Sequence, residues 1–471
     1  MRTISTRLVA AVAAAALTAA MATGCTGKPA GSPVDEGDTG GKQRTFTYDT
    51  YSQVVTEWDP AISYSNEIIA MSNVYETLTR YDAETEKVEP LLATEWDSSN
   101  GGRTWTFTLR DDVTFHSGRK LTAEAAKGAI DRTRKLGKGA AYIWDAVKEV
   151  QAPESDRLVL ELKYPAPMDL ISSADYAAYI YDTEAAGDAD LQKWFNKGND
   201  AGTGPYTAGD WEQGEEIELT LDKYGKYWGG WSGNRYSRVV YRVVPQDTTA
   251  AQLARSGEVS FVQQMSPHLW KTFKDDKSVT RPARNSWQNL FALFNTESGP
   301  LADKRARQGM AHAIDYEGIL AALKGAGTRT PGVVPDGLLG HDPRLPQYER
   351  DTAKAKQLLN AAGYGPGKKQ LKLSLTYTEG DSNEQLAASL IKSNLAKLNV
   401  KLTTRGLQWP TQWAKAKSSD LKNRQDILLF YWWPDYASPY SWFINLFHTE
   451  QPPSRSTCSA TVCATHSTRG G

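Results

Sequence analysis

The chain has 471 residues, a formal net charge of −1, 40% hydrophobic residues and 23% charged residues. This length exceeds what one hydrophobic core serves, so we expect two or three lobes of an ordinary globular protein. The balanced charge and the lack of a basic stretch argue against nucleic acid as a partner.

The N-terminal residues read as a leader and a tether. Residues 1–24 combine a basic start with an apolar run, 8–22, which has the length of a secretory signal and is short for a membrane span. The run ends in "ATGC", where Cys25 resembles the lipidated cysteine of bacterial lipoproteins, with Ala22 in place of the usual leucine. Residues 25–44 are rich in Gly, Pro, Ser and Asp, so we expect a flexible tether. A secreted protein without a lipid is the alternative.

Strand and helix patterns follow one another through the first half of the body. In chain order we predict a strand at 44–52, a helix at 66–82, a hairpin at 103–118, a helix at 121–136 with Thr122 as its N-cap, a strand at 156–165, and a turn, strand and aromatic hairpin end over 202–230.

The second half is richer in helices. We predict helices at 301–314, at 351–365 with Gly363 as its stop, and at 383–400, and strands at 372–378 and 426–433. Because these helices and strands alternate, this half is expected to be an α/β structure. The sequence contains no internal repeat.

The last residues lose this periodicity. Residues 449–471 are rich in Ser, Thr, Pro and Arg and hold two of the three cysteines, Cys458 and Cys463. We interpret this aberrant tail as a coding sequence read in the wrong frame, with a disordered tail as the alternative, and assign the cysteines to neither a metal site nor a disulfide. We expect no disulfide and no thiol nucleophile in the folded body.

Signatures of enzymes are missing from the sequence. It has no Ser-centred nucleophile elbow, no Walker loop and no HExxH motif. The histidines of the body are scattered without ligand spacing: His116, His268, His312, His341 and His448. His116 in "FHSG" is interpreted as a solvated turn residue. We therefore predict that the protein is not an enzyme and holds no metal and no cofactor.

Several blocks of the sequence resemble, in the same order, the extracytoplasmic solute-binding proteins of family 5, which serve ABC importers for oligopeptides, dipeptides and nickel. The blocks cover most of residues 45–448. They are "VYETLTRYDAETEKVEPLLATEWDSSNGGRTWTFTLRDDVTFHSGRKLTAEAAK", "GTGPY" followed by "LDKYGKYWGG", "LFALFNTESGPLADKRARQGMAHAIDYEGI", "DTAKAKQLLNAAGYG" and "LFYWWPDYASP".

The resemblance implies an α/β periplasmic-binding-protein fold of the class II type, with two lobes, a hinge and an extra small domain. Lobe I would comprise residues 45–83 and 201–291, the small accessory domain 84–200 and lobe III 292–448. A ligand would bind between the lobes and be buried by hinge closure. Family chains continue past the "WxxDY" motif with residues that complete lobe III and return a strand to lobe I. Because residues 449–471 do not match that part, we expect a truncated or frameshifted C-terminus.

The stretch "YWWPDYASPYSWF", residues 431–443, carries the candidate binding site. In peptide-binding members of the family the Asp of the "WxxDY" motif binds the ligand's terminal ammonium, and the resemblance gives this role to Asp435. A carboxylate in a partly dry site suits an ammonium group. A surface turn after Pro434 is the alternative. Ser438 stands where the family usually has a second Asp, which leaves a ligand other than a peptide open.

Trp432, Trp433 and Tyr436 of the same motif are further candidate ligand contacts. Trp287, Asn289 and Trp409 lie in blocks that face the cleft in the family, so the resemblance makes each a candidate contact, with core packing as the alternative. Trp432 and Trp433 point to opposite faces of the strand, so we expect one of them to be core. Arg405 and Arg424 are candidates for binding a ligand carboxylate, with surface solvation as their alternative.

The resemblance thus implies a lipid-anchored receptor on the outer face of the cell membrane. It would capture a peptide or similar small solute and deliver it to the permease and ATPase subunits of an ABC transporter. We expect a monomer that contacts the membrane only through its lipid. A secreted hydrolase, and a sensor or adhesion module on the same fold, are the alternatives.

Overall fold

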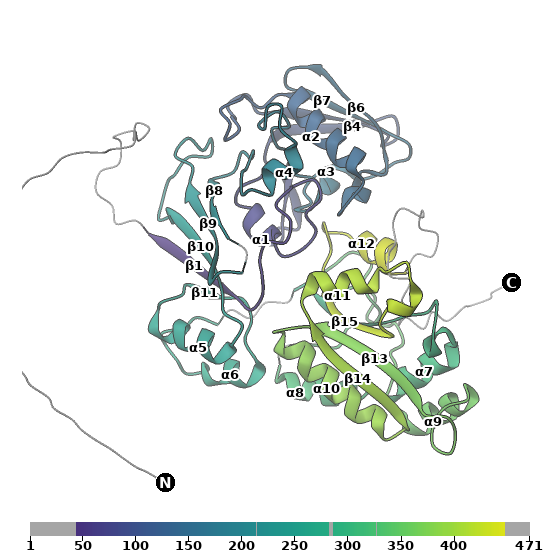
Figure 1. Cartoon of the computed structure of the whole chain (residues 1–471). Coiled ribbons are helices and arrows are strands. Elements are labelled where there is room, and N and C mark those ends of the chain that lie inside the picture. The colour runs from purple at the N-terminus through teal and green to yellow at the C-terminus, as the bar shows by residue number, and fades with distance from the viewer. Residues whose placement is uncertain (1–43, 213, 282–285, 326, 448–471) are drawn as a thin grey trace, which may run out of the picture. The chain divides into compact units, whose positions relative to one another are not determined.

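The computed structural model describes residues 44–212, 214–281, 286–325 and 327–447. The predicted leader, most of the tether and the tail, with Cys25, Cys458 and Cys463, lie outside these residues. The described part holds four β-sheets with helices around them (Figure 1). None of its helices has both the length and the apolar character that crossing a bilayer requires.

A five-stranded sheet joins the start of the body to residues far along the chain. Its order is β11-β1-β10-β9-β8, formed by β1 (Thr45–Thr50), β8 (Tyr206–Trp211), β9 (Ile217–Lys223), β10 (Arg238–Val243) and β11 (Phe261–Val262). Strand β1 is parallel to β10 and β11, whereas β8, β9 and β10 are antiparallel. Helices α5 (Asp247–Ser256) and α6 (Pro267–Thr272) flank β11 in the chain. The two segments assigned to lobe I therefore share one sheet, and their outer boundaries stay predictions.

A four-stranded antiparallel sheet follows, in the order β4-β5-β7-β6. Its strands are β4 (Ala93–Ser99), β5 (Thr104–Leu109), β6 (Val147–Glu154) and β7 (Arg157–Leu162). Helix α2 (Ala123–Leu136) packs against β6 and β7. It confirms the predicted helix: the Thr122 side chain accepts a hydrogen bond from the Ala125 N–H, and Gly137 ends the helix at φ 59°. The short helices η1 (Ala141–Trp144) and α3 (Met168–Ile171) pack with the core of this sheet, whereas α4 (Leu191–Phe195) packs with the core beside β9 and β10.

The predicted helix over 66–82 is wrong beyond its first turn. Helix α1 spans only Ile68–Met71, and β2 (Thr79–Asp82) pairs with β3 (Lys87–Pro90) in a two-stranded sheet. The apolar residues that suggested one helical face serve two different cores: Tyr75 packs beside β9 and β10, whereas Leu78 packs with the antiparallel sheet.

The predicted hairpin over 103–118 is also wrong in its pairing. Strand β5 pairs with β4 before it and with β7 after it, and residues 110–120 form turns with a single bridge between Thr114 and Lys120. The alternation itself holds, since Phe107 and Leu109 are buried on the core face.

The second half forms a mixed sheet in the order β12-β15-β13-β14. Its strands are β12 (Asn289–Phe294), β13 (Leu371–Thr378), β14 (Val400–Leu407) and β15 (Ile427–Trp432). Strand β13 is parallel to β14 and β15, and β12 is antiparallel to β15. Helix α10 (Ser382–Ala396) connects β13 to β14 and packs on both (Figure 1). This α/β arrangement confirms the prediction for this half.

The remaining helices of this half are η2 (Pro300–Ala302), α7 (Lys304–Ala313), α8 (Tyr316–Leu323), α9 (Thr352–Ala361), α11 (Trp409–Ala416), η3 (Leu421–Asn423), α12 (Tyr440–Trp442) and η4 (Phe443–Phe447). The Asp303, Asp351 and Asp381 side chains cap α7, α9 and α10. The predicted helix over 383–400 ends earlier than expected, because Val400 begins β14.

A buried ion pair ties α2 to the segment after β1. The Arg132 guanidinium donates to Asp59, with 2.8 Å between Nη1 and Oδ1, and the Asp59 side chain is fully buried. Tyr181 accepts a further hydrogen bond from Arg132. The charge of Asp59 is thus matched inside the protein, as a buried carboxylate requires.

Candidate functional site

Strand β15 ends at a turn that carries the predicted binding carboxylate. Trp432, at the last strand position, is 6% exposed and packs with Phe430 and Trp413. Trp433 is half-buried and faces away from this cluster toward the antiparallel-sheet core. Each of the two tryptophans packs against a core and also borders a cavity described below, so which of them contacts a ligand stays a prediction. The chain then turns at Pro434 and presents Asp435.

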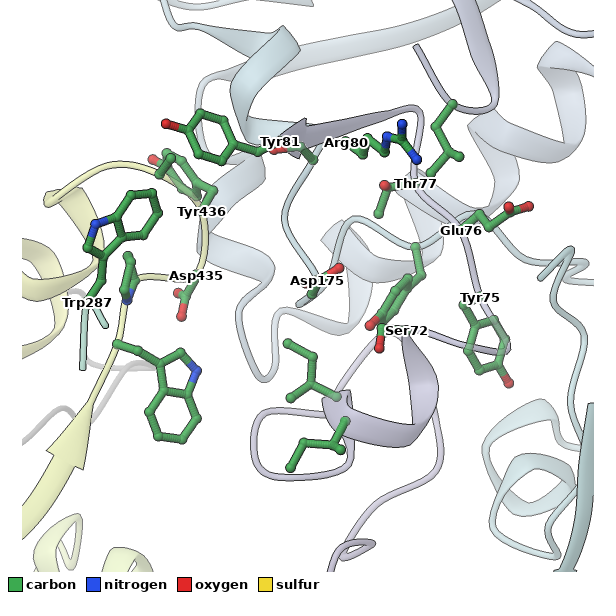
Figure 2. A pocket seen from close by; sticks show the side chains of 18 of the residues that line it. Ser72, Tyr75, Glu76, Thr77, Arg80, Tyr81, Asp175, Trp287, Asp435 and Tyr436 are labelled. Carbon is green, nitrogen blue, oxygen red and sulfur yellow. The ribbon is translucent and has the colours of Figure 1, made fainter. Parts of the chain in front are cut away.

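A cavity of about 750 Å³ lies beside this turn (Figure 2). We call it the larger cavity. Residues 66–81 form one part of its wall, residues 173–179 another and residues 433–437 a third. Its charged and large aromatic lining includes Glu76, Arg80, Asp175, Trp287, Asp435 and Tyr436. The fold thus brings together segments that are more than 200 residues apart in sequence.

A smaller cavity of about 160 Å³ adjoins the same turn. Its wall is dominated by aromatic rings, from Tyr51, Tyr64, Tyr176, Trp409, Tyr431, Trp432 and Trp433, and it also includes the carboxylates of Glu384 and Asp435. Asp435 and Trp433 line both cavities, so they stand at the place where the two spaces meet.

Asp435 is 6% exposed, and its carboxylate receives a hydrogen bond from the Tyr142 hydroxyl on η1. Burial raises its pKa from the usual 3.8 to about 7, and the Tyr142 hydrogen bond offsets part of that rise. A carboxylate removed from water in this way gains from a cation placed against it, because the cation stabilises the charged form that burial disfavours.

Two other predicted residues line these cavities with rings that also pack against protein. Trp287 faces the larger cavity and lies 5.8 Å from the Tyr81 ring, centroid to centroid. Trp409 faces the smaller cavity and stacks on Trp413 at 5.4 Å with an interplanar angle of 20°. Tyr436 lines the larger cavity from the turn itself. Their binding roles stay predictions.

The structure places the remaining candidates elsewhere. The Asn289 amide donates to the Val333 carbonyl at 2.8 Å, a bond that anchors the start of β12. Arg405 lies on β14, opposite Thr376 of β13. Arg424 pairs with Glu297 and donates to a backbone carbonyl. None of these three side chains is among the residues that line the two cavities.

Sequence reasoning missed three charged residues of the larger cavity. Arg80 lines it from β2, and its Nε and Nη2 donate to the Glu89 carboxylate at 3.0 and 2.7 Å. Glu76 accepts hydrogen bonds from Thr203, Tyr227 and Trp228 at 2.8–2.9 Å. Asp175 follows α3 in a loop. No local pattern marks these residues, because their position depends on contacts between distant segments.

Glu384, which lines the smaller cavity, does stand in a recognisable sequence pattern, but that pattern indicates a helix start. Asp381 and Glu384 stand at the N-cap and N3 positions of α10, a spacing typical of helix capping. The Glu384 carboxylate accepts from the Thr378 N–H, and burial beside Asp381 raises its pKa well above the usual value. A capping pattern predicts a helix start, but it does not predict that the carboxylate also reaches a cavity.

His116 is not the solvated turn residue that the sequence suggested. Its side chain is buried, pairs with Asp200 through Nδ1 and contacts the Gly204 carbonyl at 2.9 Å from Nε2. It thereby joins the turn after β5 to the start of β8. Within the described ranges, no group of three or more His, Cys, Asp or Glu side chains could hold a metal ion.

Known proteins are similar to this chain in sequence and in fold. The chain is 26% identical over 403 residues to the probable D,D-dipeptide-binding periplasmic protein DdpA of Escherichia coli, which covers 83% of this chain and 75% of the relative. The structure of the murein tripeptide binding protein MppA of Escherichia coli matches with a TM-score of 0.77 and 22% identity, over 88% of this chain and 83% of the other. DppA of Helicobacter pylori, in complex with the peptide STSA, matches with a TM-score of 0.74 and 21% identity, over 86% and 81%.

These likenesses show the α/β periplasmic-binding-protein fold that the sequence predicted. A sequence model described as bacterial extracellular solute-binding proteins, family 5 Middle, matches residues 87–454. Because this match spans well over half of its length, the chain belongs to family 5 of the bacterial extracellular solute-binding proteins.

Proposed function

We propose that this protein captures a peptide, or a similar small solute with a free ammonium group, in the larger cavity, and that Asp435 binds the ammonium. The buried Asp435 carboxylate carries this proposal. It lines the cavity, its neighbours include hydroxyl and aromatic groups, and burial makes its charged form costly without a cation. A ligand ammonium supplies that cation in a charge-assisted hydrogen bond, which strengthens as water leaves the site.

The size and walls of the cavity support a peptide-sized ligand. Its volume of about 750 Å³ falls among those of small-molecule sites. Trp287, Trp433 and Tyr436 provide flat apolar surfaces with polar edges, which accept different ligand side chains without a demand for one shape. The names of DdpA and MppA, and the peptide bound to DppA of Helicobacter pylori, also support a peptide.

The receptor would act outside the cytoplasm and make no covalent change to its ligand. Family membership supports an extracytoplasmic place and delivery to the permease and ATPase subunits of an ABC importer. The "ATGC" sequence supports a lipid on Cys25 that holds the body at the outer face of the membrane.

Calorimetry with a matched pair of ligands tests the role of Asp435. Trialanine is expected to bind the purified protein, and N-acetyl-trialanine is not, because acetylation removes the cation that Asp435 requires. Asp435→Asn should weaken trialanine binding by about 2–5 kcal/mol, as expected when a buried charge loses its partner. Asp336→Asn, which removes the same charge from an exposed loop position, is the control. Equal affinity for the two peptides would exclude Asp435 from the ammonium role.

A further inference from the structure

We propose that Asp175 is a second cation-binding residue of the larger cavity, so that the receptor prefers peptides with a positively charged side chain in addition to their terminal ammonium. This inference rests on the proposed function and names its ligand class more closely.

Asp175 is the exposed residue in a run of buried ones. Ala174, Tyr176, Ala177 and Ala178 are each at most 3% exposed, whereas Asp175 between them is exposed and lines the larger cavity (Figure 2). A surface loop ordinarily presents several polar residues to solvent. Here the loop is packed inward on both sides, and one carboxylate alone is turned into the cavity.

The protein holds this loop in place from several directions. The Tyr176 hydroxyl donates to the Ser65 carbonyl at 2.9 Å, and the Trp144 Nε1 donates to the Ala177 carbonyl at 2.8 Å. Ala177 has a φ of 61°, a left-handed conformation that costs a non-glycine residue about 1–2 kcal/mol. Since packing maintains this conformation, Asp175 is presented by a rigid support, as a binding residue should be.

The carboxylate of Asp175 has no partner of its own. Across the described ranges no hydrogen bond or ion pair engages it, so its charge is open to a cation in the cavity. Tyr179 lines the same cavity, and its hydroxyl is likewise buried without a hydrogen-bond partner in that part of the chain. An exposed carboxylate and a buried hydroxyl, neither of them engaged by a protein group of the described residues, thus border one space, which a polar ligand can fill.

The other charged groups of the cavity are already engaged. Glu76 accepts three hydrogen bonds from protein groups, and Arg80 is paired with Glu89. Asp435 and Asp175 are therefore the charged groups that a ligand in the larger cavity meets, and both are negative. Figure 2 shows the two carboxylates on different segments, Asp435 on the C-terminal turn and Asp175 on the loop after α3.

Two carboxylates on different segments of one cavity wall fit a ligand with two cations. If Asp435 binds the terminal ammonium, Asp175 is placed for the side chain of a lysine or arginine residue. The aromatic rings in the same wall, among them Trp287 and Tyr436, add favourable faces for such a cation.

Isothermal titration calorimetry with Ala-Lys-Ala and Ala-norleucine-Ala tests this inference. The two peptides have nearly the same shape and differ in the side-chain ammonium. We expect the wild-type protein to bind the lysine peptide at least about tenfold more tightly. Asp175→Asn should weaken the lysine peptide to the level of the norleucine peptide and leave the latter unchanged. Asp188→Asn, an exposed carboxylate outside the cavity lining, should keep the preference.

The other outcomes separate this inference from the proposed function. Equal binding of both peptides by the wild-type protein would overturn the role of Asp175 and leave the ammonium site of Asp435 standing. A loss of both peptides in Asp175→Asn would show that the residue supports the cavity wall without binding a cation, which also overturns the inference. Failure of both peptides to bind the wild-type protein would overturn the proposed peptide function and this inference with it.

Discussion

Asp435→Asn should stabilise the ligand-free protein at alkaline pH, although it destroys the proposed ammonium site. The carboxylate is buried. Its pKa is set by desolvation and by the Tyr142 hydrogen bond, and no positively charged group contributes to the shift. Asparagine has the same shape, carries no charge, and still offers an oxygen to the Tyr142 hydroxyl. The substitution therefore removes a desolvation cost and keeps the hydrogen bond.

The size of this effect follows from the shift in the Asp435 pKa from 3.8 to about 7. Because the pKa is higher in the folded state, the folded protein binds the proton more tightly than the unfolded chain does. The wild type therefore loses stability as the pH rises from about 4 to about 7, and the full cost is present above that range. At 1.36 kcal/mol per pKa unit, the cost reaches about 4 kcal/mol at pH 8 and falls to about 1 kcal/mol at pH 4.5.

Urea unfolding of the wild type, Asp435→Asn and the control Asp336→Asn at pH 4.5 and pH 8 measures this difference. Other titrating groups are common to all three proteins and cancel when a variant is compared with the wild type. Asp435→Asn should exceed the wild type in free energy of unfolding by a margin that grows with pH, and Asp336→Asn should not. A margin that is the same at both pH values, or that shrinks as the pH rises, would refute the reasoning.

Two further substitutions test the surroundings of the site and the core. Tyr142→Phe removes the hydrogen bond that lowers the Asp435 pKa, so that pKa should rise further. The increase in trialanine binding with pH should then shift to higher pH, toward the range near pH 8 in which the ligand ammonium loses its proton, and an unchanged increase in calorimetry from pH 6 to pH 7.5 would contradict this. Arg132→Met leaves Asp59 buried without its partner and should lower the free energy of unfolding in urea by about 3–5 kcal/mol. Arg344→Met, in an exposed pair with Asp342, should leave stability unchanged, and equal losses in both variants would count against a special role for the buried pair.

Local signals made much of the fold predictable. Helix α2 follows from Thr122 at its N-cap, a helical spacing of apolar residues and a glycine at its end, all of which are adjacent in sequence. Strands β13 and β15 follow from their alternation and apolar runs. Residues 66–82 were mispredicted because their buried side chains belong to two cores, and one sequence pattern cannot show which neighbour each residue meets.

The candidate site was predictable only where a family motif marked it. Asp435 stands in the "WxxDY" pattern, and the structure places it at both cavities. Asp175 stands in no pattern, and what distinguishes it is that its neighbours are buried while it is not. Arg80 likewise lines the larger cavity only because of where the β2–β3 pair packs. These properties arise from the packing of distant segments, so no reading of nearby residues could supply them.

The aromatic cluster behind Asp435 gives the protein an optical signal of its own. Trp409 and Trp413 are stacked, and Trp413 also lies 6.0 Å from Trp432, centroid to centroid. Indole rings at such separations couple their strong far-ultraviolet transitions, which gives paired bands of opposite sign in far-ultraviolet circular dichroism. Trp409 and Trp432 also line the smaller cavity, so a molecule that enters this space changes the surroundings of the coupled rings. Entry of a molecule into the smaller cavity can thus be followed by circular dichroism, with no label attached to the protein or to that molecule.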